Sequence, residues 1–307
     1  MSKPLVIGIG EVLWDFLPAG KQLGGAPANF AYHAHALGAA ALVVSRVGND
    51  PLGCELLSRL KGVGLRTDGI TTDPSAPTGT VSVTLDGQGK PTFTIHENVA
   101  WDLMEAVKQS LNEASKADAV CFGTLAQRNA IARAAIRAIV QATPPTALRI
   151  FDINLRQHFW SREIILESLE LADVMKLNDE ELPIVAGLFG LSGDESNQMR
   201  QIAARFQLKA VALTKGANGS SLVVGNELVS RPGTKLTVVD SVGAGDSYTA
   251  ALALGLLAGY SPGRILAQAH RIADYVCTQS GAMPPLPPRL FDTWHEGVSA
   301  FRTKEAI

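Results

Sequence analysis

The stretch Asp240-Ser241-Val242-Gly243-Ala244-Gly245-Asp246 separates a strand-like run at 236–239 from an almost wholly apolar run that follows it. Its small residues allow a tight turn, so we expect consecutive backbone N–H groups to converge at the start of a helix over 246–258. Convergent N–H groups of this kind form an anion-binding nest. Asp246 would lie in the first helical turn beside that nest, where a carboxylate either stabilises the helix dipole or acts as a catalyst. The spacing alone leaves both roles open.

Outward from this stretch, short apolar runs alternate with helical periodicities along most of the chain. The expected strands lie at 5–9, 41–47, 119–123, 149–153, 174–177 and 210–213. The expected helices lie at 27–37, 52–61, 127–142, 162–171, 195–206, 246–258 and 263–279. Alternation of this kind implies parallel strands joined by right-handed crossovers. We therefore predict an α/β body with helices on both faces of the sheet.

Two segments break the alternation. The first, 11–23, is strand-like but follows the first strand without an intervening helix. The second, 78–96, indicates two strands around Asp86-Gly87-Gln88-Gly89, which is a hairpin signal. We expect a small separate sheet that covers a cleft as a lid, with a surface decoration or a dimer contact as the alternative. The predicted organisation is one domain over 1–307, with a lid subdomain at approximately 11–24 and 71–101.

Composition narrows the class of protein. The 307 residues include 27 Lys and Arg against 29 Asp and Glu, a net charge of −2. Because the chain has neither a basic excess nor a basic stripe, we expect no nucleic-acid partner. Apolar residues make up 46% and charged residues 18%, so the chain can fill a large core. The length favours one large domain with an appendage.

The cysteines and the apolar runs indicate the cellular compartment of the protein. Cys54, Cys121 and Cys277 form no CxxC pair and are odd in number, which disfavours a disulfide scaffold and favours a reducing compartment. The apolar run at 5–9 is too short for a signal peptide, and the longest one, 248–260, falls short of a membrane span. We therefore expect a cytoplasmic protein with no membrane partner.

An aspartate beside an anion nest supplies two needs of phosphoryl transfer. It can accept the proton of an attacking hydroxyl, while the nest neutralises charge on the transferring group. The phosphate loop GxxxxGK[ST] is absent, and Gly8-Ile9-Gly10 lacks the third glycine of GxGxxG. These absences disfavour a P-loop enzyme and a Rossmann dehydrogenase.

Four stretches, in register over nearly the whole chain, resemble the ribokinase/PfkB family of carbohydrate kinases. The stretch 240–246 is similar to the carboxy-terminal signature of that family, and Gly24-Gly25-Ala26-Pro27-Ala28-Asn29 is similar to its sugar-binding signature. Asn178-Asp179-Glu180-Glu181 matches its NxxE motif, and 47–53 matches another family stretch. The resemblance implies a ribokinase-like three-layer α/β/α fold with a mostly parallel central sheet and a small β-sheet lid.

The resemblance also implies roles on the phosphate side. Asp246 would be the catalytic base, and the backbone amides of Gly243, Ala244 and Gly245 would form the anion hole. Asn178 and Glu181 would order Mg²⁺ and its waters near the phosphates of ATP, with Glu181 acting through water. A helix cap followed by solvated acids is the alternative for that pair.

Further positions correspond to nucleotide and cation sites of the family. A stretch that resembles the TxGxxG motif would bind ATP through Thr214, Lys215, Gly216 and Gly219. Some family members bind a monovalent cation through backbone carbonyls, and the corresponding positions here are Asp240, Val242 and 276–281. K⁺ is therefore a possible additional cofactor.

On the sugar side, four residues correspond to family positions. Strand alternation places Asp15 on the face opposite Trp14 and Phe16, and family position directs its carboxyl to sugar hydroxyls. The resemblance gives the same substrate side to Gly25, which allows close approach of the backbone, to Asn29 and to Arg156. A plain cap for Asn29 and a surface salt bridge for Arg156 are the alternatives.

The stretches 10–16 and 152–160 are most similar to bacterial-type fructokinases. The implied activity is ATP- and Mg²⁺-dependent transfer of the γ-phosphoryl group to a primary sugar hydroxyl, converting D-fructose into fructose 6-phosphate. A 2-keto-3-deoxygluconate kinase or another ribokinase-like sugar kinase is the alternative. A non-catalytic sugar- or nucleotide-binding regulator is a different class, which the intact Asp246 and glycine stretch disfavour. A homodimer through the lid is a further hypothesis.

Overall fold

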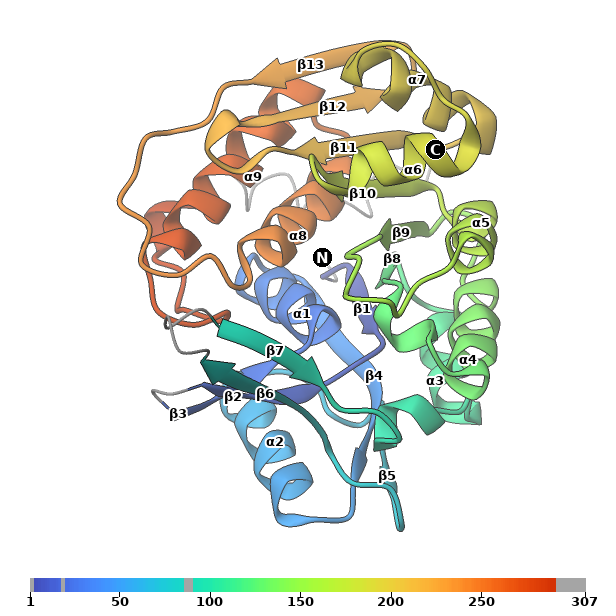
Figure 1. The fold of residues 1–307 in the computed structure, drawn as a ribbon, viewed down its shortest axis with the longest axis vertical. Coiled ribbons are helices and arrows are strands. Elements are labelled where there is room, and N and C mark those ends of the chain that lie inside the picture. The colour runs from blue at the N-terminus through green and yellow to red at the C-terminus, as the bar shows by residue number, and fades with distance from the viewer. Residues whose placement is uncertain (1–2, 18–19, 86–90, 291–307) are drawn as a thin grey trace.

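A large, mostly parallel sheet forms the centre of the molecule in the computed structural model, which describes residues 3–17, 20–85 and 91–290 (Figure 1). The strand order is β13-β12-β11-β10-β9-β8-β1-β4-β5. Neighbouring strands from β5 to β11 are parallel, whereas β12 pairs antiparallel with β11 and β13. The strands are β1 (Leu5–Ile9), β4 (Ala40–Gly48), β5 (Ile70–Asp73), β8 (Ala119–Phe122), β9 (Leu148–Asp152), β10 (Val174–Asn178), β11 (Ala210–Thr214), β12 (Ser220–Val224) and β13 (Glu227–Arg231).

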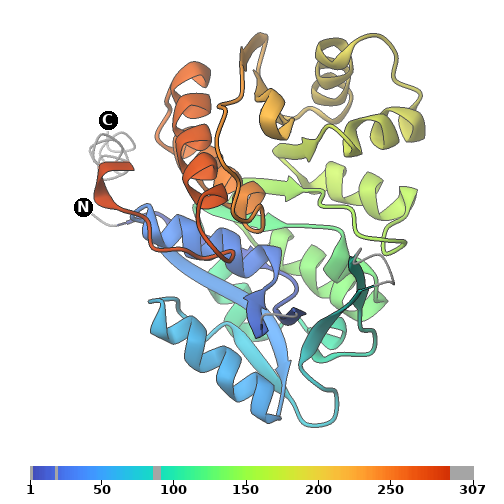
Figure 2. The same ribbon diagram turned by 60° about the vertical axis from the view of Figure 1, so that its left-hand side comes forward.

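Helices cover both faces of this sheet, and Figure 2 shows the layers from a second side. One face carries α3 (Lys108–Ala114), α4 (Ala130–Gln141), α5 (Arg162–Leu171), α6 (Glu181–Phe189) and α7 (Glu195–Phe206). The other carries α1 (Ala26–Ala36), α2 (Pro51–Gly62), α8 (Ala244–Leu257) and α9 (Pro262–Cys277). Short 3₁₀ turns lie at Ala100–Leu103, Leu125–Gln127, Gly216–Asn218 and Pro288–Leu290. The expected three-layer α/β/α architecture is confirmed.

The buried strands explain this layering. In β1, Val6 packs in one core cluster with Phe30 of α1, while Ile7 packs in the opposite cluster with Ile136 of α4. Both side chains are fully buried, as expected for a parallel strand with helices on both sides. The same alternation places Ile150 of β9 on the side of α1. A continuous apolar run therefore fixes two helical layers at once.

A second sheet is separate from the first, and its order is β3-β2-β6-β7. Its strands are β2 (Leu13–Leu17), β3 (Gly20–Gly24), β6 (Gly79–Leu85) and β7 (Pro91–Ile95). β2 and β6 are parallel, and each pairs antiparallel with its outer neighbour. The predicted lid segment 71–101 begins inside β5, which belongs to the large sheet, so the small sheet resumes only at Gly79. The predicted turn at 86–89 lies outside the described residues.

One predicted strand is wrong. The run at 236–239 forms no strand but crosses the surface between β13 and the glycine stretch. The side chains of Val238 and Val239 are 57% and 63% exposed. β-branched composition favours a strand only where a neighbouring strand and a buried face are available, and this run has neither. Among the described residues, this run donates one backbone hydrogen bond, from Val239 N to Cys277 O at the end of α9, at 2.8 Å.

The carboxyl ends of β1, β8, β9, β10 and β11 meet at one edge of the large sheet. β1 and β8 are the neighbours between which the chain order reverses, because β4 and β5 extend the sheet to one side and β9 to β11 to the other. Ligands of open α/β sheets bind at such a switch point. Among the described residues, no helix is both long enough and apolar enough to cross a membrane.

Candidate active site

The glycine stretch forms the amino terminus of α8. Gly243 is the N-cap residue with a φ of 78°, in the left-handed region. A Cβ atom on Gly243 would lie 2.4 Å from the carbonyl oxygen of Ala282, so the close packing of two backbones requires glycine here. The first-turn residues Ala244 and Gly245 line a cavity of about 470 Å³, called the larger cavity below. The predicted helix start is therefore present beside this cavity, and the convergence of its backbone N–H groups on an anion stays a prediction.

Asp246 lies in the first turn of α8 and accepts a hydrogen bond from a residue near the start of α1. Its Oδ2 accepts a hydrogen bond of 2.7 Å from Nδ2 of Asn29, in the first turns of α1. Part of Asp246 remains open to solvent, although protein surrounds its carboxyl on nearly every side. Burial, and then repulsion by Asp152, raises the pKa of Asp246 to about 6, against the lowering effect of Asn29, Lys176 and Arg156.

A buried lysine lies beneath the glycine stretch. Nζ of Lys176, on β10, is 3.1 Å from Oδ1 of Asp152, at the end of β9. A Cβ atom on Gly245 would lie 3.2 Å from the same Nζ. Thr249 donates a 2.8 Å hydrogen bond to Oδ2 of Asp152. Burial alone would lower the pKa of Lys176, but attraction to Asp152, Glu181 and Asp246 outweighs it and the pKa is raised.

Asn178 and Glu181 lie where β10 ends and α6 begins. Oδ1 of Asn178 accepts from the backbone N–H groups of Glu180 and Glu181, at 2.9 and 2.8 Å. The two carboxylate oxygens of Glu181 accept from the backbone N–H groups of Asn178 and Leu155, each at 2.8 Å. Asn178 therefore caps the helix, while the buried Glu181 ties the helix start to the loop after β9. Burial is the main cause that raises the pKa of Glu181.

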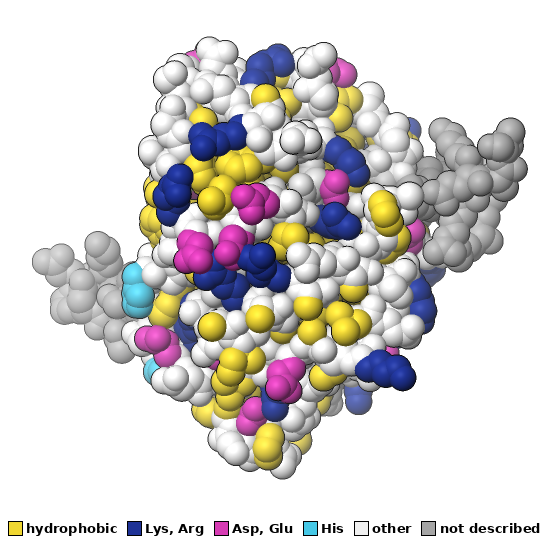
Figure 3. Space-filling model, turned by 90° about the vertical axis from the view of Figure 1, so that its right-hand side faces the viewer, with side chains coloured by type: hydrophobic (Ala, Val, Ile, Leu, Met, Phe, Trp, Pro, Cys, Tyr) yellow, Lys and Arg dark blue, Asp and Glu magenta, His cyan; other side chains and the backbone are white. Residues whose placement is uncertain are grey.

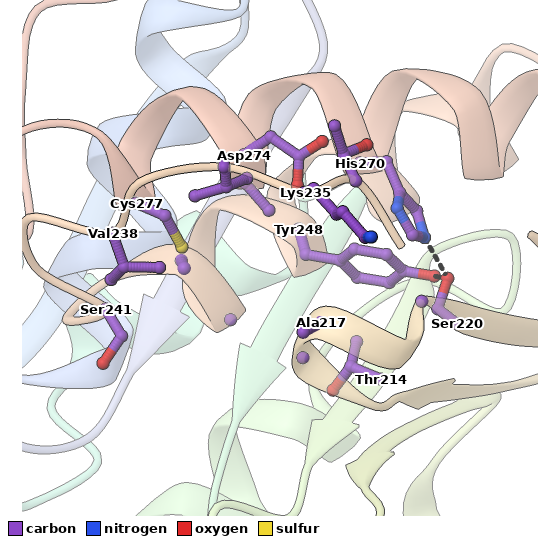
Figure 4. A pocket seen from close by; sticks show the side chains of 17 residues that line it. Thr214, Ala217, Ser220, Lys235, Val238, Ser241, Tyr248, His270, Asp274 and Cys277 are labelled. Carbon is purple, nitrogen blue, oxygen red and sulfur yellow. Dashed lines mark hydrogen bonds between the residues drawn. The ribbon is translucent and has the colours of Figure 1, made fainter. Parts of the chain in front are cut away.

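The larger cavity measures about 470 Å³ and opens between α8, α9 and the β11–β12 turn (Figure 4). Three residues of the predicted nucleotide-binding stretch, Thr214, Gly216 and Gly219, line it. Deep in the cavity, the hydroxyl of Tyr248 donates to Oγ of Ser220 at 3.0 Å. The same Oγ lies 2.7 Å from Nε2 of His270, as Figure 4 shows.

Lys215 is placed differently from the prediction. Its Nζ forms a 3.0 Å ion pair with Glu195 of α7, and Lys215 is not among the residues that line the cavity. The backbone explains this placement, because Lys215 N bonds to Gly219 O and closes a tight turn. The turn directs the glycines towards the cavity and the lysine side chain towards α7.

Two of the predicted sugar-side residues lie where the small sheet meets α1, with Asp15 on β2 and Gly25 between β3 and α1. A Cβ atom on Gly24 would lie 2.2 Å from Oδ2 of Asp15, so the carboxyl of Asp15 occupies the space that the glycine leaves. Gly25 has a φ of 110° and packs its backbone against that of Glu11. Burial raises the pKa of Asp15 to about 6, and the positive charge of Arg156 opposes this rise. Arg156 is exposed, and its Nη1 donates to Leu155 O at 3.0 Å.

Asp240 connects the glycine stretch to the segment after α9. Its Oδ1 accepts from Val242 N at 3.0 Å, and its Oδ2 accepts from Gly281 N at 3.1 Å. The backbone of Asp240 also donates to Cys277 O at 3.3 Å. The positions predicted to supply cation-binding carbonyls, Asp240, Val242 and 276–281, are thus joined in one substructure.

Several functional candidates were not predicted from the sequence. Lys176 could have been found, because a lysine inside the apolar strand VMKLN must be buried and needs a partner. Glu11 gives a similar signal, as a carboxyl next to a buried strand. The hydrogen-bonded set of Ser220, Tyr248 and His270 gives none, because these residues come from three distant segments. Among the described residues, no group of three or more His, Cys, Asp or Glu side chains could hold a metal ion.

Comparison with known proteins identifies the relatives of this chain. The family model described as pfkB family carbohydrate kinase matches residues 19–289. The fructokinase of Escherichia coli is 31% identical over 306 residues, which cover 92% of this chain and 95% of that protein. The fructokinase of Klebsiella pneumoniae is 30% identical over 298 residues, covering 91% and 95%.

Solved structures agree in fold over nearly the whole chain. A fructokinase of Vibrio cholerae O395, in a form with fructose, ADP and calcium ion bound, has a TM-score of 0.80 at 26% identity and covers 95% of this chain and 99% of that one. An uncharacterized sugar kinase of Pyrococcus horikoshii has a TM-score of 0.78 at 28% identity, with coverage of 95% and 98%. Sequence and fold agree that this chain belongs to the PfkB family of carbohydrate kinases.

Proposed function

We propose that the protein transfers the γ-phosphoryl group of ATP to the primary hydroxyl of D-fructose and forms fructose 6-phosphate. One observation carries the proposal: Asp246 accepts a hydrogen bond from the predicted sugar loop through Asn29 while it lies in the first turn of the helix that follows the anion nest. A carboxylate at the junction of the two loops can take a proton from a bound hydroxyl as that hydroxyl attacks the phosphoryl group.

On the sugar side, Asn29 and Asp15 supply hydrogen-bonding groups. Oδ1 of Asn29 is buried and has no hydrogen-bond partner among the described residues, so a sugar hydroxyl bound at this position would satisfy it. Asp15 offers acceptors, and Gly25 lets the ligand approach the backbone. The exposed guanidinium of Arg156 acts on the carboxyls of Asp15 and Asp246 and balances their charge.

On the nucleotide side, we assign the larger cavity to ATP. Thr214, Gly216 and Gly219 line one side of it, and Ala244 and Gly245 line it at the start of α8. We assign the anion hole to the backbone of Gly243, Ala244 and Gly245. Backbone N–H groups at a helix start stabilise negative charge on the transferring group. The ammonium of Lys176 adds positive charge directly beneath Gly245. Because Lys215 pairs with Glu195, it contributes at most to the edge of this cavity.

The donor set suits Mg²⁺ bound through water. Each carboxylate oxygen of Glu181 accepts only one backbone N–H, which leaves lone pairs for water ligands, and Asn178 lies beside it. Mg²⁺ bound there would neutralise phosphate charge. Backbone carbonyls at Asp240 and Val242 would serve K⁺, since Asp240 already fixes the geometry of both segments of that site.

Charge favours a neutral ketose over a sugar acid. The sugar side carries two carboxyls with raised pKa, Asp15 and Glu11, against one guanidinium, Arg156. The carboxylate of 2-keto-3-deoxygluconate would meet net repulsion there once these groups ionise. The fructokinases of Escherichia coli and Klebsiella pneumoniae, and the fructose-bound structure from Vibrio cholerae, support the same choice. 2-Keto-3-deoxygluconate remains the alternative substrate.

We further propose a single domain over 1–307 whose small sheet acts as a lid. Gln157, next to Arg156, donates a 2.7 Å hydrogen bond to the carbonyl of Phe93 on β7, which supports contact between lid and body. We also propose a homodimer in which the outer strands of that sheet form the contact. A monomer mass in light scattering would contradict it.

The free thiols of Cys54, Cys121 and Cys277 suit the cytoplasm. On the face in Figure 3, acidic and basic side chains are interspersed, which supports the absence of a nucleic-acid partner.

The test is ADP release with ATP and Mg²⁺ over fructose, 2-keto-3-deoxygluconate, ribose and adenosine, with product identified by mass spectrometry. We expect turnover to be highest with fructose. Asp246→Asn should lower kcat by on the order of 10²-fold or more, because it removes the base but keeps the shape. Ser247→Ala is the matched control on the same helix. Binding of sugar and ATP without turnover would instead favour the regulator, and wild-type turnover by Asp246→Asn would refute the base.

A further inference from the structure

Glu11 caps α1 from a different part of the chain. It follows β1 and is only 4% exposed. Its carboxyl interacts with its own backbone N–H and with that of Ala26, the first residue of α1, and both interactions lower its pKa. The N-cap residue, Gly25, has no side chain for this purpose. A carboxyl at a helix start satisfies an N–H group that the helix leaves unpaired. Glu11 therefore fixes the loop that we assign to the sugar.

Glu11 also shares a cavity with Asp246. This small cavity measures about 10 Å³, close to the least space that holds one buried water molecule. Cys121 at the end of β8 and Asp152 at the end of β9 line it as well, so it lies at the switch point of the sheet. Three carboxyls thus face one small space, those of Glu11, Asp152 and Asp246, and Asp152 among them is already paired with Lys176.

The charges around this cavity separate the two ionisations. Burial, and after it repulsion by ionised Asp246, raise the pKa of Glu11 to about 7 against the lowering effect of nearby backbone N–H groups and of Arg156. Asp246 has a pKa of about 6, raised by burial and by Asp152 and lowered in part by Lys176. Because ionised Asp246 disfavours ionisation of Glu11, the two carboxyls share one proton over an intermediate pH range. Coupled carboxyls of this kind titrate as a pair.

We propose that Glu11 is a positioning residue for the base: through one water in the shared cavity, it takes up the proton that Asp246 removes from the sugar hydroxyl. The inference rests on the proposed function. The sugar O–H bond breaks as its proton passes to Asp246, the proton then moves through the water to the Glu11 carboxylate, and Asp246 returns to its ionised form. Glu11 releases the proton to solvent before the next turnover.

The test compares Glu11→Gln with Glu11→Asp. Glutamine keeps an oxygen that accepts from Ala26 N–H, so the cap remains, but it cannot take up a proton. We expect the pH profile of kcat for the wild type to rise through two ionisations. Glu11→Gln should show only the lower one and a plateau on the order of 10-fold below wild type, a smaller loss than for the base itself. Glu11→Asp should restore the second ionisation.

A buried carboxyl elsewhere provides the control. Asp102→Asn removes an acid that is paired with Arg128 away from the cavity, so it should lower stability without changing the shape of the pH profile. A wild-type profile and plateau in Glu11→Gln would overturn the proposal and leave Glu11 as a helix cap only. Full wild-type activity of Glu11→Gln at any pH would overturn it as well.

Infrared spectroscopy gives a readout that needs no turnover. Between the two ionisations, the wild type should show the band of a protonated buried carboxyl, which is absent in Glu11→Gln and retained in Asp246→Asn. If that band is missing from the wild type, Glu11 stores no proton and the proposal fails. If the band behaves as expected but no sugar is phosphorylated, the proposed function fails and the paired titration stands.

Discussion

The side-chain amide of Asn29 donates a 2.7 Å hydrogen bond to the carboxylate of Asp246, across 217 positions of sequence. It is the direct link between the loop that opens α1 and the helix start that we assign to phosphate. His33, one turn further along α1, lies 2.9 Å from the carbonyl of Ala282, which packs against Gly243. α1 therefore holds both the acid and the glycine stretch in place.

Loss of this link should change the pH dependence of the reaction. The hydrogen bond from Asn29 lowers the pKa of Asp246, so Asn29→Leu should raise that pKa. The acid limb of kcat/KM for fructose should then move to higher pH, by up to about 1 unit. Ser247→Ala, which removes a hydroxyl bonded to Ala244 O, should leave the limb in place. An unchanged limb in Asn29→Leu would show that the bond does not control the base.

Ionisation of Asp246 should lower the free energy of unfolding at neutral pH. Its folded pKa of about 6 lies above the ordinary value of 3.8, so the folded state holds the proton more tightly than the unfolded state. The resulting stabilisation is present below about pH 4 and is lost as pH rises towards 6. Asp246→Asn should therefore be more stable than wild type above pH about 6, by on the order of 1 to 3 kcal/mol, and equally stable in acid.

Denaturant melts at several pH values measure this difference. Asp68→Asn is the control of opposite sign, because the hydrogen bond from Arg66 lowers the pKa of the Asp68 carboxyl. That variant should lose a little stability at neutral pH and none in acid. A pH-independent effect of Asp246→Asn would contradict the burial of its charge.

Gly243→Ala should impair both folding and catalysis. The new Cβ would lie 2.4 Å from Ala282 O, and the φ of 78° is unfavourable for alanine. We expect a loss of about 2 kcal/mol or more in the free energy of unfolding, together with loss of turnover. In Gly62→Ala no atom lies within 4 Å of the new Cβ, so thermal stability should be unchanged or slightly higher. Wild-type stability of Gly243→Ala would show that the loop adapts to a side chain.

The three cysteines should differ in reactivity towards a thiol reagent. Cys54 is exposed and should react at the same rate with or without ATP. Cys277 lines the larger cavity, and burial raises its pKa, so it should react more slowly and be protected further by ATP. Cys121 is buried with a pKa well above the ordinary value and should not react in the folded protein. Peptide mass spectrometry measures all three, and equal labelling of Cys277 with and without ATP would move the nucleotide elsewhere.

The layers of the fold and the glycine positions can be predicted from the sequence. The periodicity of apolar residues and the short apolar runs predict which segments become helices or strands, because each buried strand needs packing partners on both faces. The φ at Gly25 and Gly243 and the close backbone contacts there require glycine, so the signatures are readable as residues. Asp246 was identifiable because it follows such a signature directly. The run at 236–239 was misread, because strand propensity depends on neighbours that a sequence does not show.

Which groups share the site depends on contacts between distant segments of the folded chain. The pairing of Lys176 with Asp152, the bond from Asn29 to Asp246 and the cavity between Glu11 and Asp246 each join separate segments. Lys215 shows the converse, since a motif position placed it at the nucleotide and a tight turn directs it to Glu195. The burial of a side chain and the charges around it are set by its position in the folded molecule. Local sequence specifies backbone conformation, whereas a pKa depends on every group the fold brings near.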